Sequence, residues 1–131
     1  MNWLIALFFP LSAMLSPTAF GDELRHPSFG SALVGTWAET AEKCKANDES
    51  NVVIEPVKYG DAMGVCEVRW IVITAGAGGT TNYAAHSLCT NAKDATKTET
   101  VNIIARPLGP DRALMGRSFN DLKNYQRCSA E

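Results

Sequence analysis

The sequence predicts a small all-β protein: an antiparallel meander barrel or sandwich of six to eight strands with two disulfides, preceded by a signal peptide. Three observations predict this fold class. Short runs rich in β-branched residues recur about every 8–12 residues between turn-forming residues. No segment sustains the apolar period of about 3.6 residues that an amphipathic helix requires. All four cysteines follow an uncharged N-terminal segment, as in small exported domains with disulfides.

Residues 1–21 are expected to be the signal peptide. They contain no Asp, Glu, Lys or Arg, and an apolar run extends from Trp3 to Leu15. That run has the length of a signal-peptide apolar region and is shorter than the ~20 residues that cross a bilayer. Ala19 and Gly21 place small residues before a cleavage ahead of Asp22. We therefore expect a periplasmic or secreted protein with no stable membrane association after cleavage; an uncleaved anchor is the alternative.

The rest of the chain is expected to be one β domain, residues 32–131, behind an extended polar arm at 22–31. The whole chain carries 12 Lys plus Arg and 14 Asp plus Glu, a net charge of −2. Nucleic-acid-binding proteins usually carry an excess of clustered basic residues, and this chain has no such excess. No nucleic-acid partner is therefore expected.

The strands of the domain are expected at 32–38, 51–59, 65–75, 81–91, 98–106 and 113–120, with 121–128 closing the chain. Residues 39–49 are polar and have room for one helical turn. Pro56 indicates an edge or a bulge in the second strand, because proline donates no ladder hydrogen bond. Glycine and proline mark turns at 60–64, 76–80 and 107–112.

The four cysteines allow three disulfide connectivities. The segments 65–75 and 81–91 should form a hairpin, and a symmetric hairpin has its midpoint between Ala77 and Gly78. Cys66 then faces Cys89, with Cβ atoms close enough for a disulfide. The same register pairs Val68 with Ser87, Trp70 with Ala85, and Val72 with Tyr83. Cys44 is left to pair with Cys128. A one-residue bulge would shift this register, and Cys44–Cys66 with Cys89–Cys128 stays the alternative.

Signals for catalysis or metal binding are weak. The loop 76–79 precedes a strand and has no lysine nearby, which favours a flexible hairpin over a phosphate site. His86 and Ser87 are adjacent on a strand and point to opposite faces, so they cannot form a base–nucleophile pair. His86 is expected to be a surface or half-buried residue. There is no Cys-x-x-Cys and only two histidines, so no metal or cofactor is expected.

The large aromatic side chains on strands are Trp37, Trp70 and Tyr83. Core packing is their expected role. The alternative is a barrel mouth lined by Trp70 and Tyr83 that binds a small apolar ligand.

Gly35-Thr36-Trp37 resembles the G-x-W signature that opens lipocalin-like (calycin) barrels, and Asn124-Tyr125-Gln126-Arg127 resembles their closing segment. This resemblance implies that Arg127 packs across Trp37 in a cation–π contact that closes the barrel. The contact would lie beside the proposed Cys44–Cys128 bridge.

Small bacterial periplasmic metalloprotease inhibitors open with a similar G-x-W and insert an N-terminal arm into the protease cleft. Residues 22–29 are long enough for such an arm. The overall pattern also resembles small exported proteins of Gram-negative bacteria. Together these features predict a non-catalytic binding or inhibitory module whose partner is another periplasmic protein. A small apolar-ligand carrier and an enzyme without a recognisable motif are the alternatives.

Overall fold

The structure, a computed structural model, describes residues 24–129; the expected signal peptide and the first two residues of the expected arm lie outside this range. The strands are β1 (Arg25–His26), β2 (Gly35–Ala38), β3 (Val52–Glu55), β4 (Lys58–Asp61), β5 (Gly64–Ala75), β6 (Thr81–Asn91), β7 (Thr98–Gly109), β8 (Arg112–Gly116) and β9 (Lys123–Arg127). The helical segments are α1 (Ala41–Ala46) and the two 3₁₀ turns η1 (Ala77–Gly79) and η2 (Phe119–Asp121).

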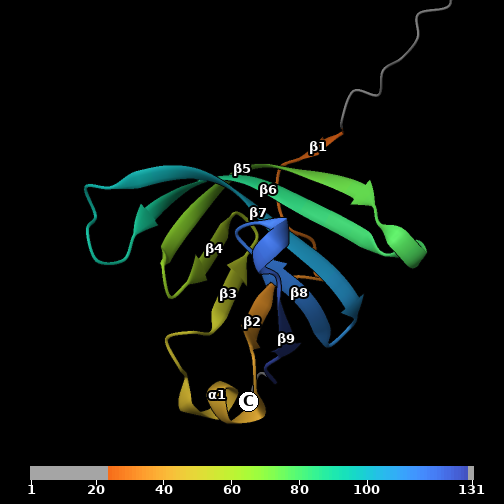
Figure 1. Ribbon diagram of the computed structural model, residues 1–131, viewed down its shortest axis with the longest axis horizontal. Helices are drawn as coiled ribbons and strands as arrows, with labels where there is room; N and C mark the ends of the chain where they lie inside the picture. Colours follow the sequence, from red (N-terminus) through yellow and green to blue (C-terminus); the bar gives the residue numbers. More distant parts are fainter. Residues whose placement is uncertain (1–23, 130–131) are drawn as a thin grey trace, which may run out of the picture.

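Strands β2 to β9 form a closed antiparallel barrel (Figure 1). Neighbouring strands follow the order β5-β4-β3-β2-β9-β8-β7-β6, and pairing between β5 and β6 closes the sheet. Strand β1 is an additional strand on β5, beyond the part of that edge that β4 covers. The predicted all-β class is confirmed, and the architecture is a barrel.

The barrel interior is filled by side chains that alternate with outward-facing ones along each strand. On β5, for example, Cys66 and Val68 are buried while Glu67 between them is exposed. The largest fully buried side chains are Trp37, Tyr59, Leu33, Ile54, Ile71, Ile103 and Met115. These side chains belong to one hydrophobic core.

The single strand expected at 51–59 is wrong, because two strands occupy this region. Strands β3 and β4 are joined by a tight turn at Pro56 and Val57. Proline has no N–H for a ladder hydrogen bond, so it suits the turn better than a strand interior. Its carbonyl is still used, since the Phe29 N–H donates to the Pro56 oxygen at 2.7 Å.

Both predicted disulfides are confirmed: Cys44–Cys128, with a Cα–Cα distance of 5.4 Å, and Cys66–Cys89, with 3.9 Å. Cys66 and Cys89 are directly opposed in the β5–β6 ladder, as predicted, and so are Val68 and Ser87. The fully symmetric hairpin behind that prediction is wrong.

The register shifts by one residue between Val68 and Trp70, so Arg69 forms a bulge and Trp70 pairs with His86 instead of Ala85. Val72 likewise pairs with Ala84 instead of Tyr83. The turn is also displaced, because its closing pair is Ala75 with Thr81. The two displacements cancel at the cysteines, which is why the predicted bridge forms.

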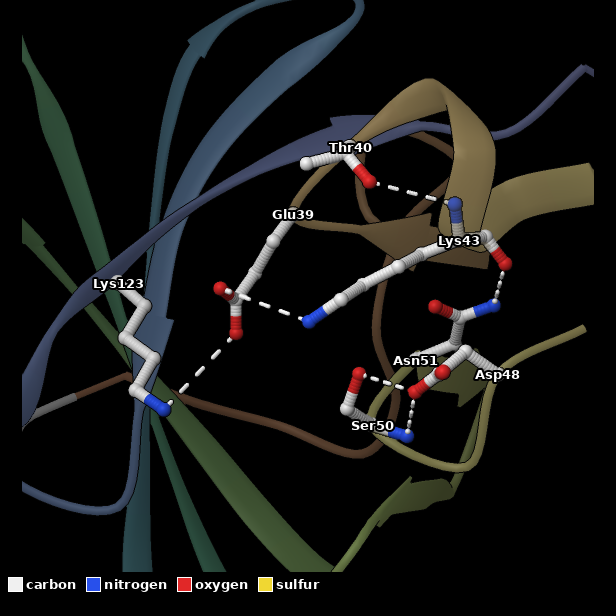
Figure 2. Close-up of polar contacts among 7 residues, drawn as sticks. All are labelled: Glu39, Thr40, Lys43, Asp48, Ser50, Asn51 and Lys123. Carbon is white, nitrogen blue, oxygen red and sulfur yellow. Dashed lines mark hydrogen bonds and ion pairs between the residues drawn. The ribbon is translucent and has the colours of Figure 1, made fainter. Parts of the chain in front are cut away.

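Helix α1 forms in the polar segment expected to hold a helical turn, and its ends are capped by side chains (Figure 2). The Thr40 hydroxyl accepts a hydrogen bond from the Lys43 N–H at 3.2 Å. The buried Asn51 amide donates to the Lys43 carbonyl at 2.9 Å, which satisfies one of the last helical carbonyls. These caps fix the turn that carries Cys44 to its bridge with Cys128.

Arg127 on β9 contacts Trp37 and two further segments of the chain. Its guanidinium lies 4.4 Å from the centre of the buried Trp37 ring, so the contact expected from the sequence is present. The same group donates to the carbonyl oxygens of Ala32 and Val34, each at 2.7 Å, and of Pro110 at 3.0 Å. Arg127 therefore joins β9, the segment before β2 and the β7–β8 turn.

A half-buried ion pair joins the end of β4 to the chain just after β8. Arg117 donates two hydrogen bonds to the Asp61 carboxylate, at 2.8 and 3.0 Å, and the two side chains are only 16% and 14% exposed. The hydrogen bond to Asp61 raises the pKa of Arg117. Tyr59 is buried beneath the pair, and this burial, together with the nearby Asp61 charge, raises the pKa of Tyr59.

The described part of the expected arm lies against the barrel at two places. Arg25 and His26 pair with Val72 and Ile71 of β5. Phe29, 4% exposed, belongs to the hydrophobic core. Residues 24–31 are therefore anchored by a backbone ladder and by one core side chain.

Candidate functional site

The bulge at Arg69 decides which way Trp70 points. Val68 and Ile71 both face the core, so the two residues between them lie on the outer surface. A bulge places two residues of one strand opposite one residue of its partner, and here that partner is the outward-facing His86. Trp70 is therefore a surface residue held by the barrel wall.

Trp70 is the centre of a row of stacked side chains drawn from four strands. The Arg25 guanidinium on β1 lies 4.1 Å from the Trp70 ring centre. The His86 ring on β6 stacks on Trp70 at 4.2 Å, with an angle of 15° between the planes. His86 Nδ1 contacts the Asn102 side-chain oxygen on β7 at 3.1 Å, and Nδ1 must be the donor because an amide oxygen only accepts. The stack orders four side chains on a rigid sheet.

A groove adjoins this stack on the outer surface of β6 and β7. It has a volume of about 450 Å³, and its lining includes Ala84, Asn102, Ile104 and Phe119. Phe119 on η2 is 59% exposed and forms an apolar side of the groove. Asn102 belongs both to the groove and to the stack, so the two features are continuous. We call this surface the Trp70 face; its residues are Arg25, Arg69, Trp70, Val72, Asn82, Ala84, His86, Asn102, Ile104, Arg106 and Phe119.

The Trp70 face carries more positive than negative charge, although the chain has a net charge of −2. Arg25, Arg69 and Arg106 lie on it. Arg69 has an exposed carboxylate within 3.8 Å, that of Glu67. Arg106 donates to the neutral Asn82 side chain at 2.6 Å, and Arg25 has no carboxylate within 4 Å among residues 24–129. Two of the three guanidinium groups thus lack a negative partner in the described chain.

The structure does not bring the two predicted ligand-binding residues together. Trp70 faces outward, whereas Tyr83 faces inward and packs against the core. The reason is the bulge, which pairs Ile73 rather than Val72 with Tyr83. The structure therefore places Trp70 and Tyr83 on opposite faces of the barrel wall.

The other predicted site residues are structural. Trp37 and Arg127 form the cation–π contact described above. The Ser87 hydroxyl is fully buried and donates to the Ala85 carbonyl at 2.9 Å, while half-buried His86 points the other way, as the strand pattern predicted. Ser87 is therefore not a nucleophile paired with His86.

The sequence reasoning missed Arg25, Asn102 and Arg106. Shifting the hairpin register by one residue would have paired Trp70 with His86, and the β6–β7 pairing would then have added Asn102. Arg25 left no such signal, because β1 joins β5 across more than forty residues of sequence.

Comparisons with known proteins identify no relative: no family model, no curated protein and no solved structure matches this chain. Within residues 24–129, no helix is long and apolar enough to cross a bilayer. The two disulfides are typical of proteins in an oxidising compartment.

Proposed function

We propose that this protein is an exported, non-catalytic binding module that recognises another protein through the Trp70 face. The observation that carries the proposal is the stack of Arg25, Trp70, His86 and Asn102. Tryptophan and arginine are the residues most enriched among side chains that dominate binding energy. Holding them in place before binding lowers the entropy that association costs.

The same observation supports binding over catalysis. The stack presents planar groups and a shallow groove, which suit a protein surface better than a small substrate. If the partner is an enzyme, docking beside its cleft inhibits it. The described part of the expected arm, residues 24–31, contains Arg25, so it contributes directly to the Trp70 face. The proposed location is the periplasm or the extracellular space, where both disulfides persist.

The experiment compares three forms of the oxidised mature chain as bait in an extract of the periplasm. They are the wild type, Trp70→Ala, and Met63→Ala as a control for loss of an exposed apolar side chain in the turn before β5. We expect the wild type and Met63→Ala to retain the same protein and Trp70→Ala to lose it. Each bait is first shown to contain both disulfides and to melt cooperatively. Equal retention by Trp70→Ala would remove the Trp70 face from the proposal.

A further inference from the structure

We infer that the partner contributes an acidic, extended segment that crosses the Trp70 face from β1 to β7. This inference rests on the proposed function and specifies the chemistry of the partner. Its first support is charge complementarity: Arg25 and Arg106 lack a carboxylate partner among residues 24–129, on a chain whose net charge is −2. Opposite charges on two surfaces steer their encounter and fix their register.

The second support is the spacing of the two guanidinium groups. Arg25, Val72, Ala84 and Ile104 form one row across β1, β5, β6 and β7. Three steps between strands cover about 14 Å, and Arg106 lies two residues beyond Ile104, about 7 Å further along β7. The backbone positions of Arg25 and Arg106 are thus about 16 Å apart, the length of roughly four or five residues of extended chain.

The third support is the surface between them. Val72 and Ala84 are small, and the groove beside them has Ile104 and Phe119 on its apolar side. Its lining also includes Glu99 and Arg117, of opposite charge. An apolar side chain of the bound segment fits this groove while acidic residues on either side reach Arg25 and Arg106. The expected pattern is an acidic residue, about three intervening residues with a large apolar one among them, and a second acidic residue.

A membrane surface fits the same face less well. Anionic lipids are typically bound by clusters of about 4–8 Lys and Arg. The Trp70 face has three arginines, and Arg69 is already within 3.8 Å of Glu67. Two separated cations beside a groove with both apolar and polar lining residues favour a segment of protein.

The test uses a synthetic peptide with the order glycine, glutamate, alanine, phenylalanine, alanine, glutamate, glycine. A second peptide has glutamine in place of both glutamates. Binding to the oxidised mature protein is measured by calorimetric titration and by NMR shifts of the Trp70 indole and His86 ring. We expect the glutamate peptide to bind, to shift these two signals and to weaken as salt is added, and the glutamine peptide to bind much more weakly.

The matched variants are Arg25→Glu/Arg106→Glu and the control Lys45→Glu/Lys93→Glu, which changes the net charge equally at exposed lysines outside the face. The first should weaken peptide binding by about ten-fold or more, and the control should leave it unchanged. Arg25→Gln/Arg106→Gln replaces the first variant if charge reversal prevents folding, and should show a smaller loss in the same direction.

Equal binding of the two peptides, or equal losses in the two double variants, would overturn the inference. So would binding to phosphatidylglycerol vesicles without binding to the glutamate peptide. If Trp70-dependent capture of a partner persists and Arg25→Glu/Arg106→Glu leaves it intact, the acidic segment is rejected while the proposed function stands. If no Trp70-dependent partner is captured but the glutamate peptide binds as expected, the acidic chemistry stands and the protein-partner function is rejected.

Discussion

Arg127 shows how one side chain can join separate segments of a barrel. Its guanidinium has three carbonyl acceptors on two separate segments and an aromatic ring beneath it. Lysine cannot reproduce this arrangement, because an ammonium lacks the planar fork that matches several acceptors at once. The position therefore depends on geometry as well as on charge.

We expect Arg127→Ala to lower the free energy of unfolding by about 2–4 kcal/mol, from hydrogen bonds to a charged group and a cation–π contact. Arg127→Lys should recover only a small part of this loss. Urea denaturation of the oxidised protein measures both, and Arg112→Ala, at an exposed position on β8, is the control. Equal losses at Arg127 and Arg112 would contradict this role of Arg127.

Tyr59 gives a prediction about alkaline pH. Burial raises its pKa in the folded protein, while an unfolded tyrosine has a pKa near its ordinary value of about 10. Above about pH 10 the unfolded chain therefore binds fewer protons than the folded chain, so the free energy of unfolding falls as pH rises. Below that pH, Tyr59 is protonated in both states and does not lower the free energy of unfolding. Denaturation midpoints between pH 8 and about pH 11 measure this fall, which should be smaller in Tyr59→Phe; an unchanged slope would contradict the prediction.

At the scale of elements, the described arm combines an exposed part with a core part. Arg25 and His26 form a two-residue ladder on β5, whereas Phe29 is buried among core residues. These two parts should contribute differently to stability and to binding, because the burial of a large side chain dominates the free energy of folding.

We expect deletion of residues 22–26 to change the melting temperature little while weakening partner binding, because it removes Arg25 and keeps Phe29. Phe29→Ala should instead cost about 3–5 kcal/mol of unfolding free energy, since it leaves a cavity in the core. Calorimetry of both variants measures the difference. A large loss of stability in the deletion variant would show that β1 is part of the stable barrel.

The bulge on β5 makes a second prediction for an element. Deleting Arg69 leaves Val68 inward, Trp70 outward and Ile71 inward, so the alternation continues and the Cys66–Cys89 pair is kept. Deleting Glu67 instead turns Val68 outward, because one residue of slip reverses the faces of a strand. We expect the Arg69 deletion to fold with both disulfides and the Glu67 deletion to fail. Peptide mapping of the oxidised variants identifies their disulfides. If neither deletion variant folds with both disulfides, this account is contradicted.

Alternation of apolar residues, turn chemistry and cysteine positions predicted the barrel class, most strands and both bridges, because these depend on local pattern and pairing. The bulge at Arg69 and the turn at Pro56 were not predicted. Each changes the strand pairing by only one or two residues, and the residues around it are as strand-like as before. The Trp70 face followed from that bulge and from the long-range contact of Arg25, so only Trp70 itself could be singled out in advance.

At the scale of the whole molecule, closure of the barrel depends on contacts between distant parts of the chain. Strands β5 and β6 close the sheet, and the Cys66–Cys89 bridge lies within that pair. Cys44 and Cys128 are 84 positions apart and tie α1 to the end of β9. Each bridge removes conformations from the unfolded chain, more so for the longer loop.

The chain-entropy relation assigns about 4.6 kcal/mol to Cys44–Cys128 and about 3.5 kcal/mol to Cys66–Cys89. Together they amount to about 8 kcal/mol, which is comparable with the whole stability of a typical domain, about 5–15 kcal/mol. We therefore expect Cys44→Ala/Cys128→Ala to fold with a lower urea midpoint, and the fully reduced wild type to be largely unfolded at physiological temperature. Circular dichroism with and without reductant measures this, and alkylated, reduced protein that keeps the oxidised midpoint would contradict it. Because such bridges persist in oxidising compartments, we expect the barrel, and with it the Trp70 face, to be stable where both bridges can form.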